Sequence, residues 1–213
     1  GREIAQLAFF SGPPTYHGDQ LSVPVEIRSR DAEARLHAKA EVLLGQQQQV
    51  PSKISARTTA PAGDHGDVLF HGDSFRCLNK ILGMNDEGIT FTAIGTPSPG
   101  KGFRSPLLPF WLLDPLRLDA IFQALIIWSN ETVGSPCLPC SISELRVHGH
   151  ARMGELETRV ELEQFSTSLA SAKAEVLNEN GEPLMTLSGA EVVIDAALVD
   201  AFQQQELSEE TQH

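Results

Sequence analysis

Aromatic residues, cysteines and basic residues are all scarce in this sequence. Phe, Tyr and Trp make up 6% of the 213 residues, and 16 Lys and Arg stand against 28 Asp and Glu, so the formal net charge is −12. The shortage of basic residues argues against nucleic-acid binding, which needs a basic stripe. The acidic total fits partners that are neutral or that meet a local basic patch.

The three cysteines are too few for a disulfide framework. Cys137 and Cys140 form a Cys-x-x-Cys pair, but no second pair exists to complete the roughly four ligands of a zinc site. His148 and His150 alternate at a predicted strand end, again without a third ligand nearby in sequence. We therefore expect no metal site, and reduced cysteines that enter a strand.

Long hydrophobic runs are also missing. No apolar run approaches the roughly 20 residues of a membrane span, and no signal peptide opens the chain. These absences predict a cytosolic protein that does not contact a membrane. Gly1 in place of an initiator Met suggests a tag remnant, and hence a piece of a longer protein.

The segment 112–128, LLDPLRLDAIFQALIIW, predicts a buried helix. Asp114 suits the N-cap and Pro115 the first helical position. The apolar residues that follow leave no broad polar face, which indicates burial on most sides. Asp119 and Gln123 lie one turn apart on one face. A carboxylate among apolar residues is costly unless it is hydrogen-bonded, so this pair is the leading candidate for a functional site.

Alternating apolar and polar residues predict strands in the first part of the chain. A short strand is expected at residues 3–10, and a half-buried antiparallel hairpin at 21–28 and 34–44. The following stretch is rich in Gln, Pro and Gly and predicts a linker on the surface.

Residues 69–84 fit a turn followed by a short helix, because their apolar residues recur at helical spacing. The apolar residues on that face are Phe75, Leu78, Ile81 and Leu82. A strand is expected at 88–94, and a loop punctuated by Pro and Gly at 96–110.

Four more strands are expected after the buried helix, with the NENG sequence at 178–181 as a hairpin turn between the last two. The strands are expected at 141–147, 157–165, 169–177 and 184–193. A terminal helix is expected at 196–205. This element order predicts an α+β protein with the hot-dog fold, in which one antiparallel sheet wraps around a single buried helix.

Two motifs resemble a known family. LFHGDSF at 69–75, followed on the buried helix by LDAIFQ at 118–123, resembles the C-terminal hot-dog half of dehydratase domains from polyketide and polyunsaturated fatty acid synthases. That family carries a His/Tyr-Gly-Pro-x-Phe-Gln motif and then an Asp-x-x-x-Gln/His motif on the hot-dog helix. Here Asp73 replaces the proline and Arg76 the glutamine, while the second motif is complete. The dehydratase-like region of bacterial polyunsaturated fatty acid synthases is the nearest variant.

The resemblance also suggests how the chain is divided, since residues 16–44 look like the closing strands of a preceding hot-dog half. The expected parts are residues 1–50 as extra N-terminal strands from that partial half, 51–66 as a linker, 67–205 as the hot-dog domain and 206–213 as a disordered acidic tail.

The resemblance implies removal of water from 3-hydroxyacyl chains carried on the phosphopantetheine of an acyl carrier protein, with no other cofactor. This reaction needs a base for the C2 proton and an acid for the leaving hydroxyl. The resemblance assigns Asp119 to the hydroxyl, and Gln123 would hold its carboxyl in place. Gly72 and the N-terminus of the helix are expected to offer N–H groups to the thioester oxygen. The other substrate-binding candidates are His71, Phe75 and Phe122.

The catalytic histidine of the family lies in a His-x-x-x-Gly-x-x-x-x-Pro motif, which none of the seven histidines here fits. The sequence therefore carries half of an active site, and the missing histidine is expected from outside this chain or from a partner. The expected partners are the acyl carrier protein, other domains of the parent synthase, and a second copy through exposed sheet edges.

Two alternatives fit the same residues, because hot-dog domains host several functions. One is a catalytically inactive pseudo-dehydratase that serves as a scaffold or docks carrier proteins, and the other is a hot-dog thioesterase whose acid positions water. Asp119 would be sealed in the core of a scaffold. In a dehydratase it would be reached by a channel and lie near a histidine. His71 is alternatively a local hydrogen-bonding residue, and Phe75 and Phe122 plain core.

Overall fold

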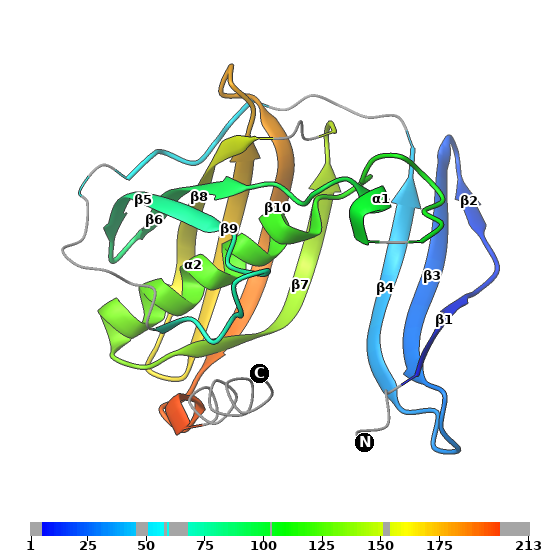
Figure 1. Ribbon diagram of the computed structural model, residues 1–213, viewed down its shortest axis with the longest axis horizontal. Helices are drawn as coiled ribbons and strands as arrows, with labels where there is room; N and C mark the ends of the chain where they lie inside the picture. Colours follow the sequence, from blue (N-terminus) through cyan, green and yellow to red (C-terminus); the bar gives the residue numbers. More distant parts are fainter. Residues whose placement is uncertain are drawn as a thin grey trace. The chain divides into compact units, whose positions relative to one another are not determined.

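The computed structural model describes residues 6–45, 51–57, 59, 68–102, 104–150 and 154–200. The chain divides into two compact units, residues Gly1–Gln48 and Gln49–His213, both drawn in Figure 1. Of the predicted terminal helix, residues 198–200 are helical and 201–205 lie outside the described residues, as does the predicted tail. The division into linker and hot-dog domain stays a prediction.

The first unit is an antiparallel sheet in which the third strand pairs with each of the others. Its strands are β1 (Leu7–Ser11), β2 (Thr15–His17), β3 (Gln20–Ser29) and β4 (Leu36–Leu44). The predicted hairpin corresponds to β3 and β4 and is confirmed. The predicted half-burial is wrong for β4, all nine residues of which are exposed. Alternation shows which residues share a face, but it does not show whether that face is covered.

The second unit is a six-stranded sheet in the order β5-β6-β8-β9-β10-β7, with every neighbouring pair antiparallel. The strands are β5 (Leu78–Asn85), β6 (Gly88–Ile94), β7 (Cys137–Val147), β8 (Glu155–Phe165), β9 (Leu169–Leu177) and β10 (Pro183–Ile194). The sheet curves around α2 (Pro115–Val133), while α1 (Pro99–Gly102) is a single turn in the loop before it (Figure 1). The predicted α+β hot-dog arrangement is confirmed.

Helix α2 begins and ends as its sequence dictates. The Asp114 side chain accepts a hydrogen bond from the backbone N–H of Arg117, and Pro115 occupies the first turn, where a missing N–H costs nothing. Gly134 ends the helix in the left-handed region at φ 80°, and its N–H bonds to the carbonyls of Ser129 and Asn130. A glycine adopts this backbone conformation at no steric cost.

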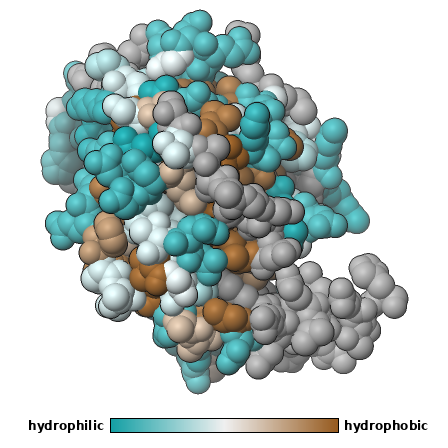
Figure 2. Space-filling view, turned by 90° about the vertical axis from the view of Figure 1, so that its left-hand side faces the viewer, coloured by the Kyte–Doolittle hydropathy of each residue, from teal (hydrophilic) through white to brown (hydrophobic). Residues whose placement is uncertain are grey.

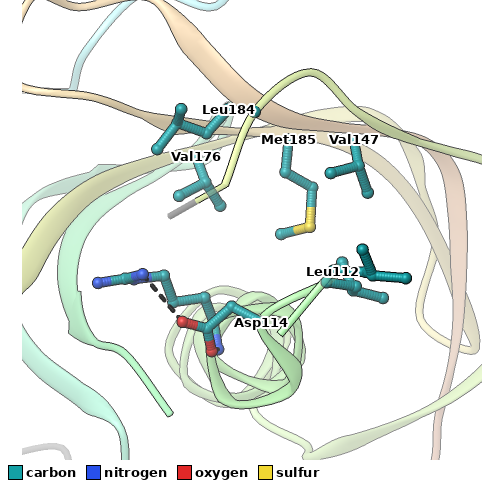
Figure 3. A pocket seen from close by; sticks show the side chains of 9 residues that line it. Leu112, Asp114, Val147, Val176, Leu184 and Met185 are labelled. Atoms are coloured by element: carbon teal, nitrogen blue, oxygen red, sulfur yellow. Dashed lines mark hydrogen bonds and ion pairs between the residues drawn. The ribbon is translucent and has the colours of Figure 1, made fainter. Parts of the chain in front are cut away.

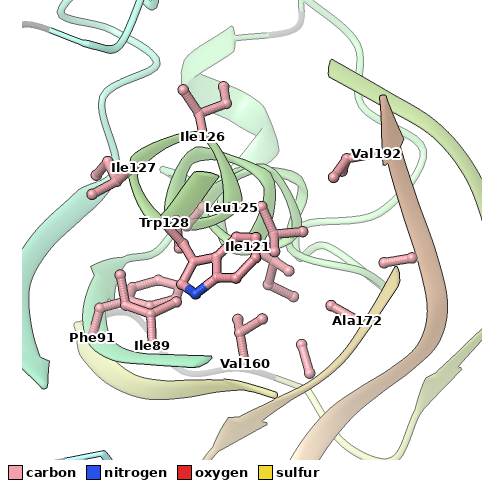
Figure 4. Packing of buried hydrophobic residues seen from close by; sticks show 14 of the residues in the cluster. Ile89, Phe91, Ile121, Leu125, Ile126, Ile127, Trp128, Val160, Ala172 and Val192 are labelled. Atoms are coloured by element: carbon pink, nitrogen blue, oxygen red, sulfur yellow. The ribbon is translucent and has the colours of Figure 1, made fainter. Parts of the chain in front are cut away.

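The core of the second unit lies between α2 and the concave face of the sheet (Figure 4). Ile121 and Leu125 of the helix are at most 1% exposed. Small residues such as Ala172 on β9 face them and let helix and sheet approach closely. Trp128 is fully buried, and its Nε1 donates to the carbonyl of Asn85 at 3.0 Å, so its polar atom is satisfied.

Residues 78–85 form a strand, so the short helix predicted in 69–84 is wrong. Two bulges cause the discrepancy, because the register slips between Leu78 and Lys80 and again between Ile81 and Gly83. Each bulge adds a residue, so Leu78, Ile81 and Met84 all pack against the core at a spacing of three. That spacing imitates a helix. Phe75, expected on the same face, is 61% exposed.

A buried carboxylate attaches residues 51–57 to the second unit. Glu175, only 5% exposed, accepts hydrogen bonds from the Ser52 hydroxyl at 2.6 Å and from the backbone N–H groups of Lys53 and Ile54. The guanidinium of Arg159 donates to the carbonyl of Ile54 at 2.9 Å. This part of the expected surface linker is therefore a strap held against the sheet.

The face of the molecule in Figure 2 is mainly hydrophilic, with smaller apolar areas between the polar ones. Among the described residues, no helix combines the length and the apolar character needed to cross a membrane. The same part of the chain contains no group of three or more His, Cys, Asp or Glu side chains placed to hold a metal ion. Cys137 is buried and Cys140 exposed.

Candidate functional site

The two polar residues of α2 are in direct contact. Gln123, which is fully buried, donates from Nε2 to Oδ2 of Asp119 at 2.7 Å. The same amide nitrogen donates to the backbone carbonyl of Phe75 at 2.7 Å. Both amide hydrogens are thus used, one on the carboxylate and one on the loop that precedes β5. Gln123 therefore fixes the orientation of the Asp119 carboxylate relative to that loop.

His71 lies in the same loop and faces the carboxylate. Its Nε2 is 3.5 Å from Oδ2 of Asp119, and the side chains are 12% and 38% exposed respectively. The imidazole stacks on the ring of Phe70 with centroids 4.3 Å apart. Burial lowers the pKa of His71; the charge of Asp119 opposes this shift and that of Arg76 adds to it. The imidazole is therefore mainly neutral at pH 7.

The loop from residue 69 to 77 is held by its own backbone and by Arg76. The carbonyl of Gly72 accepts from the N–H groups of Phe75 at 2.8 Å and Arg76 at 3.2 Å, which closes a tight turn. Arg76 Nε donates to the carbonyl of His71 at 2.8 Å, and another guanidinium nitrogen to that of Leu69 at 3.3 Å. The arginine that replaces the family's glutamine thus braces the backbone on both sides of Phe70.

Cys77 is part of this site, although its sequence context had not singled it out. Its thiol donates to the carbonyl of Leu116 at 3.0 Å and lies 3.3 Å from Nε2 of Gln123. Burial, and then the charge of Asp119, raise the pKa of Cys77 to about 12. The thiol is therefore protonated at neutral pH and unsuited to nucleophilic chemistry. Its position next to the HGDSF motif was the available signal.

The N-terminus of α2 does not offer N–H groups to a ligand, so that expectation is wrong. The N–H of Leu116 donates to the Thr96 hydroxyl at 3.0 Å, and the N–H of Arg117 to Asp114 at 3.2 Å. Asp114 also accepts the Thr96 hydroxyl at 2.6 Å and the guanidinium of Arg117 at 2.9 Å. Arg117, itself 1% exposed, donates to the carbonyl of Gly154 at 2.6 Å. The first-turn donors serve this internal network.

A cavity of about 20 Å³ lies beside that network (Figure 3) and has room for about one water molecule. Its lining comprises Leu112, Leu113, Asp114, Arg117, Val147, Gly149, Val176, Leu184 and Met185. A second, polar hollow of about 190 Å³ is lined by Ala56, Arg57, Thr59, Met84 and Asn85. Asp119 lines neither; its carboxylate is reached instead from the surface.

The substrate-binding candidates lie in different environments. Gly72 and Phe75 are exposed in the turn of the loop, whereas Phe122 is partly buried and packs against the core. The structure thus brings His71, Gln123 and Asp119 together with the backbone of Phe75. Their roles in binding or catalysis stay predictions.

Comparison with known proteins gives consistent results. The family model described as "Polyketide synthase dehydratase N-terminal domain" matches residues 45–194. The motifs had indicated a C-terminal half, and that finer assignment stays a prediction. A polyunsaturated fatty acid synthase of Thraustochytrium sp. is 27% identical in one of its subunits over 99 residues, which are 46% of this chain. The match spans 4% of that long protein.

Solved structures agree on the fold. The dehydratase domain of RzxB from Pseudomonas fluorescens superimposes with a TM-score of 0.64 at 14% identity, covering 87% of this chain and 67% of that domain. An enoyl-isomerase of a trans-acyltransferase polyketide synthase gives 0.56 at 14% identity, covering 88% and 78%. At these identities the structures show a shared fold. Because the family model covers more than half of the sequence, the chain belongs to the polyketide synthase dehydratase family.

Proposed function

We propose that this domain removes water from 3-hydroxyacyl chains bound to an acyl carrier protein. Asp119 is the acid that protonates the leaving hydroxyl. The observation that carries this proposal is the setting of Asp119: its side chain is 38% exposed, it accepts a hydrogen bond from buried Gln123, and an imidazole lies 3.5 Å away. Family membership agrees with this reaction.

Each group near Asp119 has a task in this reaction. A carboxylic acid in contact with solvent on one side can reach a substrate, while the hydrogen bond from Gln123 keeps Oδ2 in one orientation. A base is needed for the C2 proton. The family's histidine motif is missing from this chain, so the sequence places that base elsewhere in the parent synthase or in a partner.

The acyl chain and its carrier would approach from the exposed side of Asp119. Gly72 and Phe75 lie on the exposed turn beside the site and are candidates for contacting the thioester and the acyl chain. Phe122, one residue before Gln123, is the candidate for the inner end of the chain's path. The phosphopantetheine arm brings the substrate, and the site needs no other cofactor.

The two alternatives fit this setting less well. A scaffold has no use for an open carboxylate, and Asp119 is not sealed in the core. A thioesterase needs an acid that positions water, which Asp119 would satisfy, but it gives no task to the neighbouring neutral imidazole. Other domains of the synthase and a second copy of this chain are the further proposed partners, with the cytosol as the proposed compartment.

The test is an assay on a 3-hydroxyacyl thioester of pantetheine, with enoyl product followed by absorbance and free thiol measured in parallel. Wild type is compared with Asp119→Asn, and Asp86→Asn, in the exposed turn between β5 and β6, is the matched control. Because the parent synthase is proposed to supply the base, the substitutions are also made in a longer chain that contains the His-x-x-x-Gly-x-x-x-x-Pro motif. Loss of enoyl product from Asp119→Asn alone supports the proposal. Thiol release without enoyl product would indicate a thioesterase.

A further inference from the structure

His71 and Asp119 form a pair of complementary groups within one chain. Nε2 of His71 is 3.5 Å from Oδ2 of Asp119, although 47 positions separate them in the sequence. The carboxylate is partly open to solvent and the imidazole is mostly covered. The motifs alone had suggested only a binding role for His71, because it does not lie in the family's histidine motif.

We propose that His71 is the base of this site and removes the C2 proton within the chain that also carries Asp119. This inference rests on the proposed function and supplies the group that the sequence lacks. It differs from the expectation of an external histidine, because a site built in this way is complete without a partner.

The imidazole has one nitrogen available for this task. Among the described residues, Nδ1 of His71 is buried without a hydrogen-bond partner, so a substrate can meet only Nε2. The ring is held by its stacking on Phe70 and by the bond from Arg76 to the His71 carbonyl. A base must also be unprotonated, and burial favours the neutral ring.

The separation of the two atoms suits a 1,2-elimination. Atoms 3.5 Å apart can straddle the C2–C3 bond, one facing the C2 proton and the other the C3 hydroxyl. Nε2 takes the C2 proton, and the electrons of the C2–H bond form the C2–C3 double bond. The C3–O bond breaks, and the leaving hydroxyl takes the proton of Asp119 and departs as water.

The same contact resets the site. After the elimination His71 is an imidazolium and Asp119 a carboxylate, and the two form an ion pair across the same 3.5 Å. One proton transfer from Nε2 to Oδ2 returns both groups to their starting states. The cycle therefore balances with substrate, product and water alone, and needs no oxidant, reductant or metal.

The experiment uses the full chain and 3-hydroxyhexanoyl pantetheine in D₂O. Enoyl formation is followed by absorbance, and deuterium at C2 of the remaining substrate by mass spectrometry. The variants are His71→Gln and His71→Tyr, of which the second keeps a ring to stack on Phe70. His150→Gln is the matched control, since this exposed histidine contacts Phe110 and lies outside the site. Melting temperatures identify any variant that fails to fold.

We expect both His71 variants to lose at least about 100-fold in enoyl formation, the lower bound for general base catalysis, and to lose deuterium uptake at C2. Asp119→Asn should lose enoyl formation while it retains C2 exchange, and His150→Gln should match wild type. Folded His71 variants that form enoyl product at the wild-type rate would overturn the role of His71 and leave Asp119 untouched.

Two results from wild type alone also decide the matter. If the folded chain forms no enoyl product, the site is incomplete and the inference is overturned, while the longer chain still tests Asp119. If it is active, the rate should rise with pH through a midpoint below 6.5. The neutral ring is the active form, and burial lowers its pKa despite the facing charge of Asp119 and together with that of Arg76. A midpoint above 6.5 would contradict the assignment.

Discussion

Replacing Gln123 with leucine separates positioning from stability at this site. The two side chains have similar volumes, so the substitution removes the amide without leaving a large cavity. It deletes the 2.7 Å bond to Asp119 and the 2.7 Å bond to the carbonyl of Phe75. It also deletes a buried acceptor, because Oε1 of Gln123 has no hydrogen-bond partner within the described part of the chain.

These changes oppose one another in the free energy of unfolding. A bond to a neutral carbonyl contributes roughly 0.5–1.5 kcal/mol. The bond to the carboxylate contributes about 1 kcal/mol once it is discounted for the solvent exposure of Asp119. Removing an unsatisfied buried acceptor returns roughly 1–3 kcal/mol. Gln123→Leu should therefore unfold within about 1 kcal/mol of wild type.

The catalytic rate should respond differently. An acid that has lost its orienting bond worth about 1.4 kcal/mol in the transition state slows the reaction about tenfold. Enoyl formation and urea unfolding are measured on Gln123→Leu beside Gln164→Leu, an exposed glutamine of β8. An unchanged rate in folded Gln123→Leu would refute the positioning role. A loss of more than about 3 kcal/mol in stability would show that the amide is mainly structural.

Three further predictions concern the second unit. Glu175→Ala leaves three buried or half-buried donors of the strap without their acceptor, and should lower the free energy of unfolding by about 2–4 kcal/mol in urea; no change would show that the strap is not attached in solution. Leu125→Ala, at a fully buried position, should cost roughly 2–5 kcal/mol in guanidinium, and less than 1 kcal/mol would contradict the packing of α2. Iodoacetamide at pH 8 should modify exposed Cys140 first, because burial raises the pKa of Cys77 to about 12 and of Cys137 to about 11; equal labelling of all three by mass spectrometry would contradict this.

Helix α2 was predictable because its signals are local. An N-cap at Asp114, a proline at the first position and apolar residues all round agree with one another, and the structure adds only the last turn, up to Val133. The strands after it were predictable for the same reason. The limits of β9 (Leu169–Leu177) coincide with the predicted range.

Strand β5 could not be predicted from spacing alone. Its two bulges place Leu78 and Ile81 three residues apart on the inner face, which is the period of a helix. Bulges depend on the pairing with β6, so the information lies in the partner strand. The exposure of β4 has a related cause, because alternation within a strand does not reveal what packs on the sheet.

The site was predictable in part. The spacing of Asp119 and Gln123 on one helical face was sufficient to place them in contact. The approach of His71 to Asp119 depends on how the loop before β5 folds over the helix, and no local pattern specifies that distance. The use of the first-turn donors by Thr96 and Asp114 likewise follows from tertiary contacts.

The most direct test of the central claim is the rate of enoyl formation by Asp119→Asn relative to wild type, in the full chain and in the longer chain that contains the histidine motif. If Asp119 protonates the leaving hydroxyl, the rate falls at least about 100-fold in whichever chain is active, while the melting temperature stays at the wild-type value. Folded Asp119→Asn that forms enoyl thioester as fast as wild type would contradict the account.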